Sequence, residues 1–241
     1  MVLGEDSEKM SKSRGNVIAP DELVKAYGAD TVRAYLMFFA RWDLGAPWSN
    51  SGIDGTSRWL RRLWTTVVEP GEPAAEPDPE AVRVLRRKVH QALRSVTNDF
   101  RDFQFNTIIS TLMELLNEMG RLRDKVNGSP AWEEALDIYL RMLAPVAPHI
   151  TEELWSRLGK PYSIHNQPWP EVDEEAAADE EITLVVQVNG KVRDRIQVPV
   201  DISEDAAKEK ALASETVQKI LSGRPPRKVI YVPGRLVNIV G

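Results

Sequence analysis

The chain has 241 residues, a formal net charge of −5 and no cysteine. This length suffices for one large or two modest domains, and the lack of cysteine excludes disulfides, thiolate catalysis and cysteine zinc sites. No apolar run approaches the roughly 20 residues of a membrane helix, and acidic residues occupy the place of a signal sequence, so we expect a cytoplasmic protein without a membrane partner.

The opening stretch EKMSKSRGNV (8–17) concentrates lysine, serine and glycine. Lys9 and Lys12 stand three residues apart, so a flexible loop can place two ammonium groups around a polyphosphate. Serine hydroxyls and backbone N–H groups would add donors for the charge on a leaving pyrophosphate. The spacing alone leaves a second interpretation open, a solvated basic loop.

Helical periodicity dominates residues 20–158. One helix is predicted to begin at Pro20, where acidic residues fill the first turn, and Pro148 can open a later one. Apolar residues at steps of three and four predict further helices over 31–39, 56–68, 79–103, 105–126 and 132–143. We expect these apolar stripes to form the core of a helix bundle rather than a cofactor site. We also expect core positions for Trp59, Trp64, Trp132 and Trp155.

Two acidic stretches interrupt the helical pattern. Residues 69–80 contain four prolines, which favours a spacer between helices. Residues 168–181 contain seven acids and no basic residue, and are expected to form a solvated linker at a domain boundary.

Strand periodicity follows the second stretch. The runs 182–188 and 191–198 flank Asn189-Gly190, a strong hairpin signal. Ser203 is predicted to cap a helix that runs to about Leu221, and 228–232 and 236–240 are two more strands. The predicted fold class is therefore mainly α, a helical bundle followed by a small α+β (ββαββ) domain.

Charge divides along the same boundary. Residues 182–241 contain ten Lys+Arg and six Asp+Glu, a net charge of +4, whereas residues 1–181 contain 21 and 30, a net charge of −9. A basic tail after an acidic body favours a polyanion as the partner of the tail, with chance scatter as the alternative.

Several of these segments resemble the class I aminoacyl-tRNA synthetases. Residues 8–17 are similar to their KMSKS signature, and 27–31, Arg33 and Trp48-Ser49 continue the pattern that follows it in the leucyl, isoleucyl, valyl and methionyl enzymes. Residues 101–122 and 143–159 resemble the α-helical anticodon-binding-type domain. The tail resembles the C-terminal domain of bacterial leucyl-tRNA synthetases, and it lacks the heptads of valyl enzymes and the cysteines of isoleucyl enzymes.

The resemblance implies domains and an activity. Residues 1–55 would hold the KMSKS loop and a remnant of the catalytic domain with its stem-contact region, 56–170 the anticodon-binding-type domain, 171–181 the acidic linker and 182–241 a tRNA-binding domain. The implied reaction is ATP-dependent leucylation of leucine tRNA by a ligase. ATP would be a substrate, Mg²⁺ is expected in the full enzyme, and no metal ligand is expected in this chain.

The resemblance also assigns roles to residues. Lys9 and Lys12 would be catalytic, and the ATP phosphates would be bound by Lys9, Met10, Ser11, Lys12 and Ser13. The candidates for tRNA contact in the tail, with a solvated sheet face as the alternative, are Lys191, Arg193, Arg195, Arg227, Lys228 and Arg235. In the helical domain, tRNA contact and an exposed helix face both stay open for Arg83, Arg86, Arg87 and Arg94.

One signature of the family does not occur in the sequence. The HIGH motif is absent, and His149 lies in PHIT, where we expect structural hydrogen bonds or a helix cap. We therefore expect the C-terminal portion of a leucyl-tRNA synthetase that cannot activate leucine alone. Its partner would be the N-terminal catalytic and editing portion, in the same chain or as a separate subunit. Two alternatives stay open, a free-standing RNA-binding module derived from a synthetase and the equivalent part of a valyl or isoleucyl enzyme.

Overall fold

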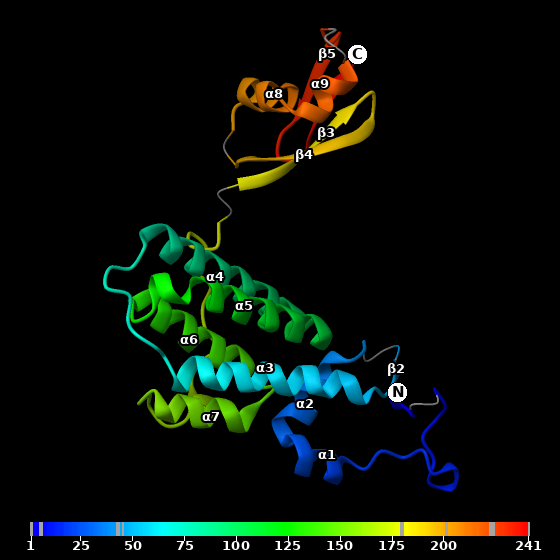
Figure 1. Ribbon diagram of the computed structural model, residues 1–241, viewed down its shortest axis with the longest axis vertical. Coiled ribbons are helices and arrows are strands. Elements are labelled where there is room, and N and C mark those ends of the chain that lie inside the picture. Colours follow the sequence, from blue (N-terminus) through cyan, green and yellow to red (C-terminus); the bar gives the residue numbers. More distant parts are fainter. Residues whose placement is uncertain are drawn as a thin grey trace. The chain divides into compact units, whose positions relative to one another are not determined.

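A computed structural model describes residues 2–4, 7–41, 44, 46–178, 181–200, 202–221 and 225–240. The chain divides into two compact units, Met1–Ala177 and Ala178–Gly241. The first unit is helical and the second combines helices with a four-stranded sheet, which confirms the predicted fold class (Figure 1). No helix within these described ranges is long and apolar enough to span a membrane.

The helices of the first unit follow the predicted order. They are α1 (Pro20–Tyr27), α2 (Ala29–Phe38), α3 (Asn50–Val68), α4 (Pro79–Arg101), α5 (Phe105–Val126), α6 (Pro130–Leu143) and α7 (Pro148–Arg157). Two short strands, β1 (Val2–Leu3) and β2 (Ala46–Pro47), pair in parallel, and 3₁₀ turns occupy Lys12–Arg14 and Ile164–Asn166. Helix α6 begins two residues earlier than predicted because the Ser129 hydroxyl caps it and proline suits its first position.

The core of the first unit lies between the long helices. α4 and α5 run side by side, and α6 packs against α4 (Figure 1). Tyr139 of α6 is fully buried; its hydroxyl accepts a hydrogen bond from Trp59 Nε1 (3.0 Å) and donates one to the Leu112 carbonyl (3.0 Å), and burial raises its pKa. Trp59, Trp132 and Trp155 are buried as predicted. Trp64 is half-buried, with the Arg157 guanidinium 4.9 Å from the centre of its ring.

The proline-containing stretch 69–80 is tied to the end of α5. The Asn127 side-chain amide donates to the carbonyls of Pro70 (2.7 Å) and Glu72 (2.8 Å). Asp78 then caps α4 by accepting from the N–H groups of Glu80 and Ala81. The stretch connects α3 to α4, as predicted for a spacer, and these two carbonyl groups are satisfied by the bundle.

The second unit is a four-stranded sheet with two helices. Its strands are β3 (Glu181–Val188), β4 (Lys191–Pro199), β5 (Lys228–Val232) and β6 (Leu236–Val240), in the order β4-β3-β6-β5. β3 is antiparallel to β4 and parallel to β6, and β5 is antiparallel to β6. Asn189 and Gly190 both have positive φ, 52° and 76°, as the predicted hairpin turn requires.

The single helix predicted over 203–221 is two helices, α8 (Glu204–Leu212) and α9 (Glu215–Leu221). Ser214 separates them. Its hydroxyl bonds the Asp194 carboxylate of β4 and accepts from the Val217 N–H (3.4 Å), which starts a new helix in place of continuing the old one. The topology is therefore ββααββ, and α8 and α9 cover one face of the sheet with Ala207, Ala211 and Val217 in the core.

The acidic stretch 168–181 differs from the predicted solvated linker. Trp169 donates to the Thr97 hydroxyl of α4 (2.9 Å) and stands edge-on to Phe100. Ala177 is 2% exposed, and its carbonyl accepts from the Gln91 side chain (3.1 Å). The stretch is therefore packed on the first unit as far as Ala177, while residues 179 and 180 lie outside the described residues.

Candidate phosphate loop and nucleic-acid interface

The loop that contains the KMSKS-like sequence is closed by Asn16. The Asn16 Oδ1 accepts from the Ser11 N–H (2.8 Å), and its Nδ2 donates to the Lys9 carbonyl (3.4 Å). Between Ser11 and Asn16, Lys12–Arg14 forms one 3₁₀ turn that ends at Gly15, whose φ of 68° suits glycine. The hydroxyls of Ser11 and Ser13 are 2.8 Å apart. The sequence therefore builds a compact loop around one amide side chain.

The loop turns one side chain inward and its lysines outward. Met10 packs against a small apolar cluster that includes Val32, Tyr35 and Trp48. Lys9 and Lys12 are exposed, and neither forms an ion pair among the residues that the structure describes. Arg14 differs from them because it pairs with Glu8 (3.1 Å). The arrangement can bring two ammonium groups, unpaired within the described part of the chain, to an anion, while Met10 anchors the loop on the apolar cluster.

The apolar cluster under the loop explains the Trp48-Ser49 part of the sequence pattern. Tyr35 donates its hydroxyl hydrogen to the Ser49 carbonyl (2.8 Å), and its ring lies 4.9 Å from the Trp48 ring, edge to face. At Gly52, an added Cβ would lie 2.7 Å from the Tyr35 ring, so only glycine fits. These residues support the loop and are separate from the atoms that could touch a phosphate.

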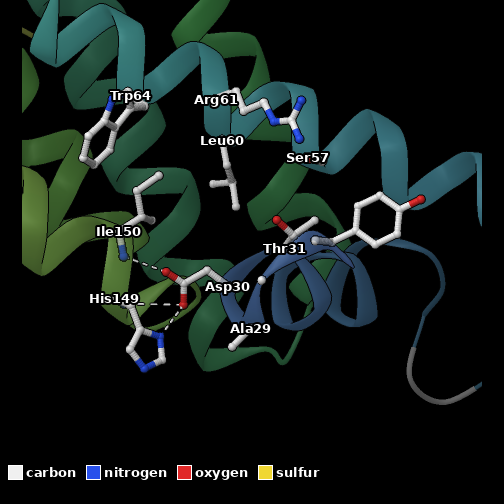
Figure 2. Close-up of a pocket in the computed structure, with 11 residues that line it drawn as sticks. Ala29, Asp30, Thr31, Ser57, Leu60, Arg61, Trp64, His149 and Ile150 are labelled. Carbon is white, nitrogen blue, oxygen red and sulfur yellow. Dashed lines mark hydrogen bonds and ion pairs between the residues drawn. The ribbon is translucent and has the colours of Figure 1, made fainter. Parts of the chain in front are cut away.

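Asp30, shown in Figure 2, and Arg33 join α2 to the turn between α6 and α7. The Asp30 carboxylate accepts from the Ile150 N–H (2.6 Å) and from His149 Nδ1 (2.8 Å), while Arg33 donates to the carbonyls of Val146 and Pro145, both at 3.1 Å. Helix α7 has no capping side chain of its own, so Asp30 caps it from another helix. His149 thus has the structural hydrogen bonds that we expect from the sequence.

A pocket of about 430 Å³ lies beside this junction, between α2, α3 and α7. Figure 2 shows Arg61 and Trp64 of α3 on one side of it and His149 with Asp30 on the other. The Asp30 charge is compensated there by the α7 backbone and the His149 ring. The pocket lies away from the loop residues assigned to ATP, none of which line it.

Six cations of the tail sheet have no acidic partner in the described part of the chain. Among the described residues no ion pair is formed by Lys191, Arg193, Arg195, Arg227, Lys228 or Arg235, and all six are exposed. Two helix lysines differ, because Lys208 pairs with Glu204 and Lys219 with Glu215. In the described part of this unit, the cations without an acidic partner are therefore these six and Lys210, which donates to the Gln197 carbonyl (2.8 Å).

The sheet register divides these six cations into groups. Asp194 bonds Ser214 at the start of α9, so Arg195, the next residue of β4, points to the face that the helices leave uncovered. Arg193 is exposed and lies where the pairing of β4 with β3 shifts register. Arg227 precedes β5 and Lys228 begins it, beside Val240, at the end of the sheet where the β3–β4 hairpin carries Lys191. Arg235 precedes β6 at the other end. The structure brings most of the predicted residues to one face and one end, but not into a single cluster.

The arginines of α4 have partners within the protein. Arg86 bonds Glu134 of α6 (2.7 and 3.1 Å) and Asp173 (2.9 Å), which raises its pKa. Arg94 bonds Glu174, Arg83 bonds Glu80, and Arg87 also has an interaction partner. The charges of Arg83, Arg86 and Arg94 are therefore paired within the protein, and both interpretations of these arginines stay predictions.

The contact of α4 with 169–177 was not foreseen from the sequence. Arg86, His90 and Arg94 follow one another at steps of four residues, so they share one face of α4, and this spacing is visible in the sequence. The acidic run that complements them starts at Glu171. Arg86 and Asp173 are 87 residues apart in the chain, so no local pattern predicted that they would pair.

Low pH should weaken the contact between α4 and the segment 169–177. The pKa of Glu134 is lowered mainly by the hydrogen bond from Arg86, and that of Asp173 mainly by the Ala176 N–H and then by Arg86. Carboxylates with lowered pKa values stabilise the fold above their unfolded values, about 4.3 and 3.9, and lose this contribution as the pH falls through the folded values. We expect amides 173–177, corrected for intrinsic rates, to lose protection from hydrogen exchange between about pH 5 and pH 3. Equal protection at both pH values would contradict the assignment.

Comparison with known proteins agrees with the sequence resemblance. Residues 82–209, more than half of the chain, match the anticodon-binding domain of tRNA ligase, and residues 1–43 match the class I tRNA synthetases (I, L, M and V). The leucine–tRNA ligase of Deinococcus radiodurans is 53% identical over 241 residues, which are 100% of this chain and 29% of that protein. The leucine–tRNA ligase of Dehalococcoides mccartyi is 50% identical over 240 residues, 99% of this chain and 29% of that protein.

Solved structures show the same relationship. The crystal structure of an Agrobacterium radiobacter LeuRS, in a ternary complex with tRNA and LeuAMS, matches with a TM-score of 0.82 and 33% identity. The match covers 100% of this chain and 32% of that one. Mycobacterium tuberculosis methionyl-tRNA synthetase, with a TM-score of 0.54 and 19% identity over 67% of this chain and 38% of its own, shares the fold alone.

The leucyl relatives are longer than this chain, which spans less than a third of their length. Within that span the match to leucyl enzymes is continuous, from the opening loop to the last strand. The chain therefore belongs to the tRNA ligase family of class I, as a relative of the leucine–tRNA ligases.

Proposed function

We propose that the chain supplies the ATP-phosphate loop and the tRNA-binding surfaces of a leucine–tRNA ligase. The observation that carries the first part is the loop 9–16, closed by Asn16 and anchored by Met10, with Lys9 and Lys12 exposed and unpaired among the described residues. Leucylation requires ATP, leucine and leucine tRNA, and it takes place in the cytoplasm, where tRNA is charged.

In this proposal the two lysines act on charge that develops during leucine activation. As the bond to pyrophosphate breaks, negative charge grows on the leaving group, and ammonium groups already in place stabilise it. Met10, Ser11 and Ser13 shape the loop, and the serine hydroxyls add donors. Mg²⁺ would accompany ATP in the complete enzyme, and the proposal assigns it no ligand from this chain.

The isolated chain should not activate leucine. Its sequence has no HIGH motif, and the proposal places the adenine and leucine pockets in a separate N-terminal portion, in the same chain or as another subunit. We expect leucine-dependent ATP–pyrophosphate exchange by the pure chain to stay at background. Exchange that depends on leucine and is abolished by Lys12→Ala would contradict this division of labour.

The tail cations support the second part of the proposal, tRNA binding. Replacing Arg193 and Arg195 together by alanine should weaken binding of leucine tRNA and lower the slope of log K against log salt by about two, one for each lost phosphate contact. The matched control is Lys208→Ala with Lys219→Ala, which removes two lysines that are paired on α8 and α9. Equal losses in both double variants would show a general effect of net charge in place of a defined contact.

A further inference from the structure

The segment 169–177 is held along one side of α4 by five successive contacts. The Arg86 guanidinium bonds the Asp173 carboxylate (2.9 Å), and His90 Nδ1 accepts from the Asp173 N–H (3.2 Å). The other contacts are Gln91 to the Ala177 carbonyl, Arg94 to Glu174 and Trp169 to Thr97. Asp173 therefore receives bonds on both its side chain and its backbone.

Glu134 of α6 orients the two α4 residues that hold Asp173. Its carboxylate bonds Arg86 Nε (2.7 Å) and Nη2 (3.1 Å), and it lies 3.2 Å from His90 Nε2. The His90 side chain is 3% exposed. Because Nδ1 accepts the Asp173 N–H, a neutral His90 has its proton on Nε2 and donates it to Glu134, so both ring nitrogens are committed.

The helical core does not depend on this network. Leu85, Val89 and Leu93, which are buried on α4, pack in the apolar core of the first unit. The Arg86 and Asp173 side chains are both more than a third exposed, and ion pairs at that exposure add little to folding stability. Removing Arg86 should therefore release the Asp173 carboxylate and leave the bundle folded. Release of all of 169–177 would also require loss of the contacts made by Gln91, Arg94 and Thr97.

We propose that Arg86, His90 and Glu134 form a latch that fixes the point at which the C-terminal unit leaves the helical unit, and that this latch raises tRNA affinity. The inference rests on the proposed function, in which both units contact one tRNA. With the latch closed, three residues, 178–180, connect Ala177 to β3. With the latch open, the connection runs from Trp169 and has twelve residues, 169–180.

The length of this connection sets the effective concentration of one tRNA-binding surface near the other. For flexible connections that can span the sites, effective concentration falls roughly as the −3/2 power of length, so a fourfold longer connection lowers it by about eightfold. Arg86, His90 and Glu134 are thus positioning residues. They act on the tRNA through the tether, and the proposal gives them no contact with RNA.

The test compares Arg86→Met with Arg121→Met in the full chain. Arg121 lies on α5 and pairs with Glu118, and it has no contact with 169–177 among those described here, which makes it a matched control. We expect Arg86→Met to speed hydrogen exchange of the amides around Asp173 and to weaken leucine tRNA binding measurably, with about eightfold as the limit for release of the whole segment. Glu134→Gln should act in the same direction, and Arg121→Met should do neither.

A second background separates positioning from direct contact. In the full chain with Arg193→Ala and Arg195→Ala, the tail has less affinity to contribute, so Arg86→Met should weaken binding clearly less than it does in the chain with both arginines present. Equal losses in both backgrounds would mean that Arg86 touches RNA itself, and would overturn the latch. Faster exchange without a change in affinity would also overturn it, with the proposed function intact. Failure of the unaltered chain to bind any tRNA would overturn both.

Discussion

Replacing Lys12 by alanine should slow leucine activation by about 10²- to 10³-fold in a leucine–tRNA ligase completed with this chain, the loss typical of removing one fixed donor to transition-state charge. Lys12 starts the 3₁₀ turn, is exposed and has no ion pair in the described part of the chain, so its ammonium group is available to the phosphates of ATP. Leucine-dependent ATP–pyrophosphate exchange measures the step directly.

The effect should fall on the rate more than on ATP binding. A donor that acts mainly in the transition state lowers kcat and kcat/KM together when it is removed. The control is Lys25→Ala, because Lys25 is an exposed lysine in the last turn of α1, outside the loop. An unchanged exchange rate in Lys12→Ala, or equal losses in both variants, would remove Lys12 from the catalytic group.

Replacing Asp30 by alanine should destabilise the first unit by about 2 kcal/mol, because it removes the acceptor for the α7 N-terminus and for His149. Asp30 is 9% exposed, so water compensates little of this loss. Urea unfolding followed by circular dichroism gives the free energy of unfolding. For a unit of this size the thermal midpoint should fall by roughly 4–8 °C.

Two comparisons sharpen the Asp30 experiment. Asp30→Asn keeps an oxygen that can accept from the Ile150 N–H, so it should recover part of the loss. Asp21→Ala removes an exposed acid from the first turn of α1 and should cost well under 1 kcal/mol. If Asp30→Ala costs no more than Asp21→Ala, the cap from α2 is not a stabilising contact.

Local signals predicted the elements well where the residues that decide a structure are neighbours in sequence. The apolar period of α4 and α5 marks their buried faces, and Asn189-Gly190 specifies the hairpin, because each depends on residues within a few positions. The break between α8 and α9 escaped prediction for the opposite reason. Ser214 is anchored by Asp194, 20 residues earlier, and no local pattern contains that contact.

The same distinction holds for the candidate site. The loop lysines and the serines between them are contiguous, so their chemistry could be inferred from spacing and from the family resemblance. Asp30 contacts Ile150 across 120 positions, and Arg86 contacts Asp173 across 87. No local sequence pattern contains either contact, so both became visible only in the structure. The acidic composition of 168–181 predicts a solvent-exposed linker. In the structure, Arg86 and Arg94 of α4 bind two of its carboxylates and hold the stretch against the helix.

The most direct test of the proposed function is binding of this chain to leucine, isoleucine, valine and methionine tRNA transcripts at two salt concentrations, with and without the Arg193→Ala and Arg195→Ala changes. The account predicts that leucine tRNA binds most tightly, that its affinity falls with salt, and that the double variant reduces its advantage. Equal affinity for all four transcripts, or no binding at either salt concentration, would contradict the claim that this chain contributes to recognition of leucine tRNA.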